Sequence, residues 1–76
     1  MRKKPDFIAI QLSRRIRKLR KERGLTQREL ASRAGVGDKY LQDLEGRYPR
    51  NANLLTLQKL AKGLNVREWE LLRFEE

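Results

Sequence analysis

The stretch from Thr26 to Leu44 constrains the fold of this chain more than any other part of the sequence. Ala31 lies four residues before Gly35, and Leu41 and Leu44 follow at the spacing of one helical face. A sharp turn between two crossing helices requires a small residue at the crossing and a residue that tolerates positive φ at the corner. Ala31 and Gly35 meet these two requirements. The segment therefore predicts two short helices that meet at a tight turn.

Helical periodicity covers most of the remaining chain, and no strand pattern competes with it. We predict a first helix over about residues 6–23, which Gly24 ends as a C-terminal cap. Thr26 and Glu29 form a capping box that begins the second helix. The third helix is predicted from residue 37 or 38 to Gly46, and a fourth follows the loop at residues 47–53. A fifth runs from about residue 67 to residue 74.

The predicted core combines one apolar face from each of the first four helices. Its members are Ile8, Leu12, Ile16 and Leu19, then Leu30, Ala31 and Ala34, then Leu41 and Leu44, and finally Leu54, Leu57, Leu60, Ala61 and Leu64. The second helix contributes little bulk, as expected where two helices cross closely.

The predicted fifth helix carries two apolar faces, although a terminal helix needs only one to dock on a small domain. At about 100° per residue, Val66, Trp69 and Leu72 share one face, and Leu71 and Phe74 lie roughly opposite. Two interpretations of this second face stay open. Either the helix frays and both residues touch the first helix, or they form the interface with a second copy across a two-fold axis.

The formal net charge is +9 over 76 residues, which indicates an anionic partner. Residues 1–23 hold ten Lys and Arg against two acidic residues, whereas residues 51–76 hold four of each. A basic stripe lies opposite the core face of the first helix and comprises Arg14, Arg17, Lys18 and Lys21. Such a stripe is either a solvated surface, a source of attraction for DNA or a surface for an acidic membrane. We favour DNA, because no large apolar face is left to enter lipid.

The length allows one domain, so we expect a basic N-terminal arm over residues 1–5 and a single domain over residues 6–76. No apolar run approaches the length of a membrane span, and the first four residues lead into no hydrophobic region of signal type. The protein is therefore expected to be cytoplasmic, associated with the nucleoid when bound to DNA, and without a membrane partner.

The sequence contains neither cysteine nor histidine. This removes the usual ligand sets of zinc, attached haem and iron–sulfur clusters, the commonest general base and the thiol nucleophile. No Gly-rich loop of the phosphate-cradling kind occurs either. We therefore expect no catalytic residue, metal or cofactor, no small-molecule ligand in so small a domain, and no enzymatic activity.

Five groups of residues stand in a characteristic order and spacing. They are Ile16-x-x-Leu19-Arg20, Gly24-Leu25-Thr26-Gln27-x-x-Leu30-Ala31, Ala34-Gly35-Val36, Leu41-x-x-Leu44-Glu45 and Leu57-x-x-Leu60-Ala61-x-x-Leu64-x-Val66. Over about two-thirds of its length the chain thus resembles the lambda-repressor/Cro-type helix-turn-helix family, also called the XRE family. The resemblance implies a compact, all-α, five-helix domain that binds double-stranded DNA, usually as a homodimer on a pseudo-palindromic operator. Many members are repressors.

The resemblance also assigns roles to individual residues. It implies that the third helix lies in the major groove, where the base-reading positions are Asp38, Lys39, Gln42 and Asp43. It implies phosphate contacts from the start of the second helix, from the third helix and from the following loop, namely Thr26, Gln27, Tyr40, Arg47, Arg50, Asn51 and Asn53. We expect the arm to reach around the duplex or into a minor groove through Arg2, Lys3 and Lys4.

The family's buried ion pair corresponds here to Arg20 and Glu45. The helical wheel agrees, because each residue borders the apolar stripe of its own helix. The alternative is that both are solvated surface charges.

Three features depart from the family pattern. Gly37 replaces the usual Ser or Thr cap of the third helix, and Gly46 comes one position early. Asp38 and Asp43 place two acids on the presumed reading face, where DNA phosphates repel them unless they match cytosine or are neutralised by Arg or Lys. These acids keep open an alternative function, in which the domain is a coactivator-like or antitoxin-type protein-interaction module.

Overall fold

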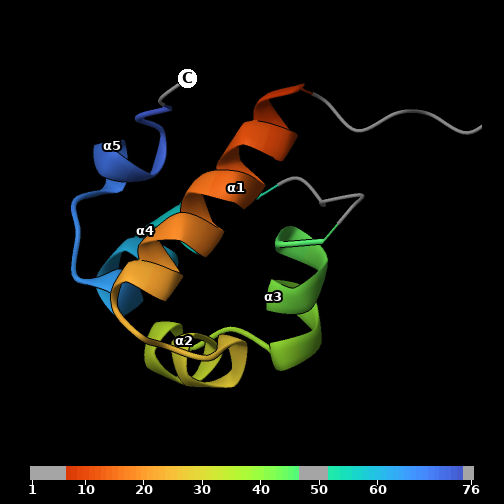
Figure 1. Cartoon of the computed structure of the whole chain (residues 1–76), viewed down its shortest axis with the longest axis vertical. Helices are drawn as coiled ribbons and strands as arrows, with labels where there is room; N and C mark the ends of the chain where they lie inside the picture. The colour runs from red at the N-terminus through yellow and green to blue at the C-terminus, as the bar shows by residue number, and fades with distance from the viewer. Residues whose placement is uncertain (1–6, 47–51, 75–76) are drawn as a thin grey trace, which may run out of the picture.

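The computed structural model describes residues 7–46 and 52–74, and all regular structure within these ranges is helical (Figure 1). The elements in chain order are α1 (Phe7–Glu22), α2 (Gln27–Ala34), α3 (Asp38–Leu44), α4 (Leu54–Leu64) and α5 (Glu68–Leu71). The all-α, five-helix prediction is confirmed. The predicted N-terminal arm and most of the loop between α3 and α4 lie outside the described residues.

Local chemistry sets most helix ends. Gly24 and Gly35 adopt φ of +65° and +73°, a backbone region that strongly favours glycine, so they end α1 and α2 as predicted. Thr26 accepts a hydrogen bond from the backbone of Glu29, whose carboxylate accepts one from the Thr26 backbone, which completes the predicted capping box. Gly35 thus forms the predicted tight turn between α2 and α3, while Gly24, Thr26 and Glu29 set the boundary between α1 and α2.

The core lies between α1, α2, α3 and α4 and is made of aliphatic side chains. Its fully buried members include Ile16, Leu30, Leu41, Leu44, Leu60 and Leu64. In Figure 1, α1 crosses the front of the molecule, α2 lies below it, and α4 lies behind it. The largest helix–helix contact joins α2 to α4, and it is close because Gly63 faces Ala34. A Cβ atom on Gly63 would lie 3.0 Å from the Ala34 Cβ atom.

The structure corrects two core assignments. Ile8 and Leu54 were predicted to be buried, but they are exposed by 58% and 83%. Both occupy the first turn of a helix, where the predicted stripe continues beyond the neighbouring elements that cover it. In α5, only one of the two apolar faces is covered. Leu71 is fully buried in the core, whereas Trp69 and Leu72 are exposed.

The fifth helix is also shorter than predicted. It ends at Leu71, not at Phe74. A single helical turn gains little from its own hydrogen bonds, so tertiary contacts decide where it stops. Leu71 anchors it, and Phe74 packs against the core beyond the end of the helix. The interpretation in which Leu71 and Phe74 form a dimer interface is therefore wrong for Leu71, which presents no surface to a second copy.

Candidate nucleic-acid interface

The third helix has one buried and one exposed face. Leu41 and Leu44 are buried, which turns Asp38, Lys39 and Gln42 to the solvent-exposed side. Asp43 is partly buried. The predicted base-reading residues therefore lie on a helix that its own apolar side chains hold in place. This arrangement leaves polar side chains exposed along α3.

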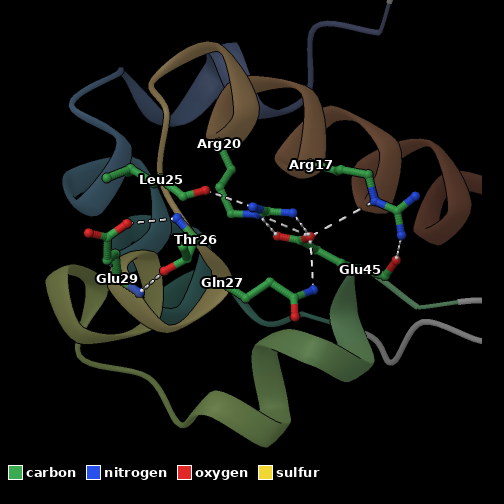
Figure 2. Close-up of polar contacts among 7 residues, drawn as sticks. All are labelled: Arg17, Arg20, Leu25, Thr26, Gln27, Glu29 and Glu45. Carbon is green, nitrogen blue, oxygen red and sulfur yellow. Dashed lines mark hydrogen bonds and ion pairs between the residues drawn. The ribbon is translucent and has the colours of Figure 1, made fainter.

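The C-terminal end of α3 is fixed by the buried carboxylate of Glu45 (Figure 2). Arg20 of α1 reaches this carboxylate with two nitrogens, Nε at 2.9 Å from Oε2 and Nη2 at 2.9 Å from Oε1. The Glu45 side chain has no exposed surface, and that of Arg20 has 11%. The predicted ion pair between these residues is confirmed, and the alternative of two solvated charges is excluded.

Two further side chains converge on Glu45. Gln27, the first residue of α2, donates from Nε2 to the Glu45 Oε1 atom at 3.1 Å. Arg17 donates from Nη2 to the Glu45 backbone carbonyl at 2.8 Å. Arg20 also donates to the carbonyl of Leu25 at 2.7 Å. One carboxylate thus joins α1, the start of α2 and the end of α3, which fixes the orientation of the candidate reading helix.

The N-terminus of α2 is capped by Thr26 and carries Glu29, an acid whose pKa is shifted. Hydrogen bonds from the Thr26 backbone N–H and side chain, followed by the nearby Arg33 charge, lower the pKa of Glu29 below its usual range. Thr26 and Gln27 were predicted to bind phosphate. Thr26 is exposed, whereas Gln27 is half-buried with one amide hydrogen bound to Glu45. Their phosphate contacts stay a prediction.

The N-terminal end of α3 has a different tether. Gly37 caps this helix without a side-chain hydrogen bond, as the sequence indicates. Arg28 of α2 instead forms an ion pair with Asp38, the first residue of α3, with 3.4 Å between Nε and Oδ2. Sequence reasoning missed Arg28, because nothing in the chain signals which cation faces Asp38.

The remaining predicted phosphate contacts have mixed positions. Tyr40 packs against the core, and its hydroxyl hydrogen-bonds Thr56 of α4 at 3.3 Å. Asn53 is the N-cap of α4 and accepts from the Thr56 backbone at 2.8 Å, which leaves its amide N–H groups for other partners. Outside the described residues lie Arg2, Lys3, Lys4, Arg47, Arg50 and Asn51.

A second surface was not predicted and lies away from α3, on α4 and α5. It contains four exposed apolar side chains, Leu54, Leu55, Trp69 and Leu72, which we call the α4–α5 apolar surface. These residues line a groove of about 500 Å³ together with Leu57, Gln58 and Glu68. One signal was present in the sequence: two adjacent leucines at a helix start cannot both point toward one core stripe.

Within the described ranges, no group of three or more acidic, His or Cys side chains is arranged to hold a metal ion. Among the same residues, no helix is long and apolar enough to cross a membrane.

The exposed polar face of α3, held by α2 and by a buried ion pair, defines a helix-turn-helix domain of the DNA-binding class. The helix-turn-helix family of XRE type matches residues 16–71, and the chain belongs to this family. Its curated relatives are HTH-type transcriptional regulators. The uncharacterized HTH-type transcriptional regulator y4dJ of Sinorhizobium fredii is 46% identical over 55 residues, which cover 72% of this chain and 70% of y4dJ.

The HTH-type transcriptional regulator SinR of Bacillus subtilis is 36% identical over 61 residues, which cover 80% of this chain and 55% of SinR. Among solved structures, the restriction-modification controller protein C.AhdI from Aeromonas hydrophila has a TM-score of 0.78 at 35% identity, covering 83% of this chain and 94% of that one. The controller protein C.Esp1396I bound to a 19 base pair DNA duplex has a TM-score of 0.79 at 33% identity, covering 88% and 92%.

Proposed function

We propose that this protein is a sequence-specific regulator that binds double-stranded DNA as a homodimer, with α3 in the major groove, and represses transcription from a pseudo-palindromic operator. The observation that carries the proposal is the clamped position of α3. Its exposed residues Lys39 and Gln42 have the chemistry to read guanine and adenine edges. The relative solved on a DNA duplex supports the same mode of binding.

The α4–α5 apolar surface supports the homodimer. Trp69 is 59% exposed and Leu72 45%, beside a groove whose lining, among the residues that the structure describes, contains one charged residue, Glu68. An isologous interface requires that each copy offer the same self-complementary patch. Here each copy carries both a protruding indole and an apolar groove, so two copies related by a two-fold axis can each insert Trp69 beside the other's α4. This surface replaces Leu71 and Phe74 as our candidate interface.

Selection of bound sequences from a pool of random duplexes tests the proposal. We expect two related half-sites in inverted order, with a fixed spacing. The logarithm of the affinity for the selected duplex should fall linearly with the logarithm of the salt concentration, because phosphate contacts release counterions. Repression is then tested by placing the selected site in a promoter and measuring transcription with and without the protein.

Two outcomes would contradict the proposal. Recovery of no preferred sequence, with affinity insensitive to salt, would favour the alternative of a protein-interaction module. Recovery of a single half-site by a protein that stays monomeric on DNA would retain DNA binding but reject the homodimer.

A further inference from the structure

Asp38 occupies an unfavourable place for an acid. It is the first residue of α3, its side chain is 48% exposed, and it belongs to the face that we place against DNA. Phosphates repel a carboxylate in the groove unless a cation or a matched base compensates for it. Within the described residues, the cation that meets Asp38 is Arg28, which approaches from α2.

Arg28 differs in its contacts from four arginines of α1 and of the residue that follows it. Arg15, Arg17, Arg20 and Arg23 each donate to a backbone carbonyl inside the fold. Arg28 instead contacts a side chain of the reading helix and keeps 87% of its own side chain exposed. In the described part of the chain, this contact uses its Nε atom and leaves Nη1 and Nη2 without a hydrogen bond.

The planar shape of the guanidinium group restricts the direction in which Arg28 can donate hydrogen bonds. Its N–H groups lie in one plane as a rigid fork, so a carboxylate bound at Nε restrains the direction of the two terminal nitrogens. A fork held in this way presents two donors with the spacing of guanine O6 and N7, the acceptor pair that guanine shows in the major groove. Lysine has no such fork and cannot be oriented by one carboxylate contact.

We infer that Arg28 is a specificity-determining residue that reads a guanine in the major groove, and that Asp38 is the positioning residue that aims it. This inference rests on the proposed function and names one of its base contacts. It changes the role of Asp38, which then acts on a base pair through Arg28 and does not accept from cytosine. It also explains how an acid is accommodated on the face that meets DNA.

Base selections with substituted proteins test this inference. Arg28→Ala should remove the preference for guanine at one position of each half-site, with a loss on the order of 10-fold to 100-fold for the preferred duplex. Asp38→Ala should weaken the preference at that same position, and the double variant should lose no more than Arg28→Ala alone, because both changes remove one contact. Arg28→Lys should fail to restore the preference.

Arg33→Ala is the matched control, since Arg33 is another exposed arginine of α2. It should leave every base preference unchanged. All variants should fold, which circular dichroism checks, because an exposed ion pair contributes little to stability.

The inference is overturned if Arg28→Ala weakens binding equally to all sequences, which is the behaviour of a phosphate contact. It is also overturned if Asp38→Ala alters a different base pair from Arg28→Ala, because Asp38 would then read that pair itself. A wild-type protein without any sequence preference would instead contradict the proposed function, so the two failures are distinct.

Discussion

At the scale of single residues, Glu45 holds the helices of the candidate nucleic-acid interface together. It is a buried carboxylate that accepts hydrogen bonds from Arg20 and Gln27, while its backbone carbonyl accepts one from Arg17. A buried charge is tolerated when its hydrogen bonds are complete, and removal of one partner leaves an uncompensated ion. The position of α3 relative to α1 and α2 therefore depends on one acidic side chain.

The first prediction concerns Arg20. Arg20→Lys keeps the positive charge but loses the fork that binds both Glu45 oxygens and the Leu25 carbonyl. We expect the free energy of unfolding to fall by about 1–3 kcal/mol, the cost of leaving buried polar groups without partners. Urea denaturation measures it. Arg14→Lys, at an exposed position of α1, should change stability by less than about 0.5 kcal/mol. Equal effects at both positions would contradict the role of Arg20.

The second prediction concerns pH. Because its folded-state pKa is lowered, ionised Glu29 contributes stability above its unfolded pKa of about 4.3, and this contribution is lost as the pH falls through the lowered folded value. Glu29→Gln keeps an oxygen acceptor but cannot ionise. The difference in unfolding free energy between the wild type and this variant should therefore shrink as the solution is acidified from neutral pH. Denaturation at a series of pH values measures it, and a difference that stays constant would disprove the assignment.

At the scale of elements, each helix depends on a neighbour for part of its position. Arg15 of α1 and Arg23, the residue after α1, donate to the backbone carbonyls of Glu70 and Leu64, which lie in α5 and at the end of α4. Cations near helix C-termini satisfy carbonyls that have no partner within the helix. Some guanidinium donors of this basic region are thus used within the fold and not left for phosphate contacts, although their positive charge remains.

The third prediction concerns the crossing of α2 and α4. Alanine is favoured over glycine by about 1 kcal/mol within a helix. At Gly63, however, a Cβ atom would lie 3.0 Å from both the Cβ and the backbone N atom of Ala34. Overpacking of this kind costs about 1–3 kcal/mol. We expect Gly63→Ala to lower the melting temperature, measured by circular dichroism. A rise in melting temperature would show that the two helices separate easily.

At the scale of the whole molecule, two surfaces have opposite character. The exposed face of α3 is polar, whereas the α4–α5 apolar surface exposes leucine and tryptophan. A small domain that reads a few base pairs gains affinity and symmetry when two copies bind together. In the homodimer that we propose, the α4–α5 apolar surface pairs the two α3 helices.

The fourth prediction tests this pairing. Leu72→Glu places a charge on the α4–α5 apolar surface and should make the protein monomeric at concentrations where the wild type is dimeric, as measured by analytical ultracentrifugation. Affinity for a full two-fold site should fall, while affinity for one half-site should stay unchanged. Phe7→Glu is the matched control, because Phe7 is 70% exposed and does not line the groove. Loss of the dimer in the control alone would place the interface on α1.

The sequence by itself determined the local features of this protein. The capping box at Thr26, the positive-φ glycines, most of the apolar stripe and the pairing of Arg20 with Glu45 follow from short-range spacing or from the family pattern, and the structure has each of them. The caps and helical faces were predictable because they depend on residues a few positions apart, whereas the pairing of Arg20 with Glu45 joins residues 25 positions apart and followed from the family pattern.

Tertiary structure alone decided which face of a helix is covered. Leu71 and Leu72 are adjacent and equally apolar, yet Leu71 is fully buried and Leu72 is 45% exposed. Leu54 satisfies the same helical period as Leu57 but extends beyond the core. The contact of Arg28 with Asp38 likewise joins residues ten positions apart across the turn. Burial and charge pairing between helices depend on how neighbouring elements pack, and periodicity within one helix carries no information about that.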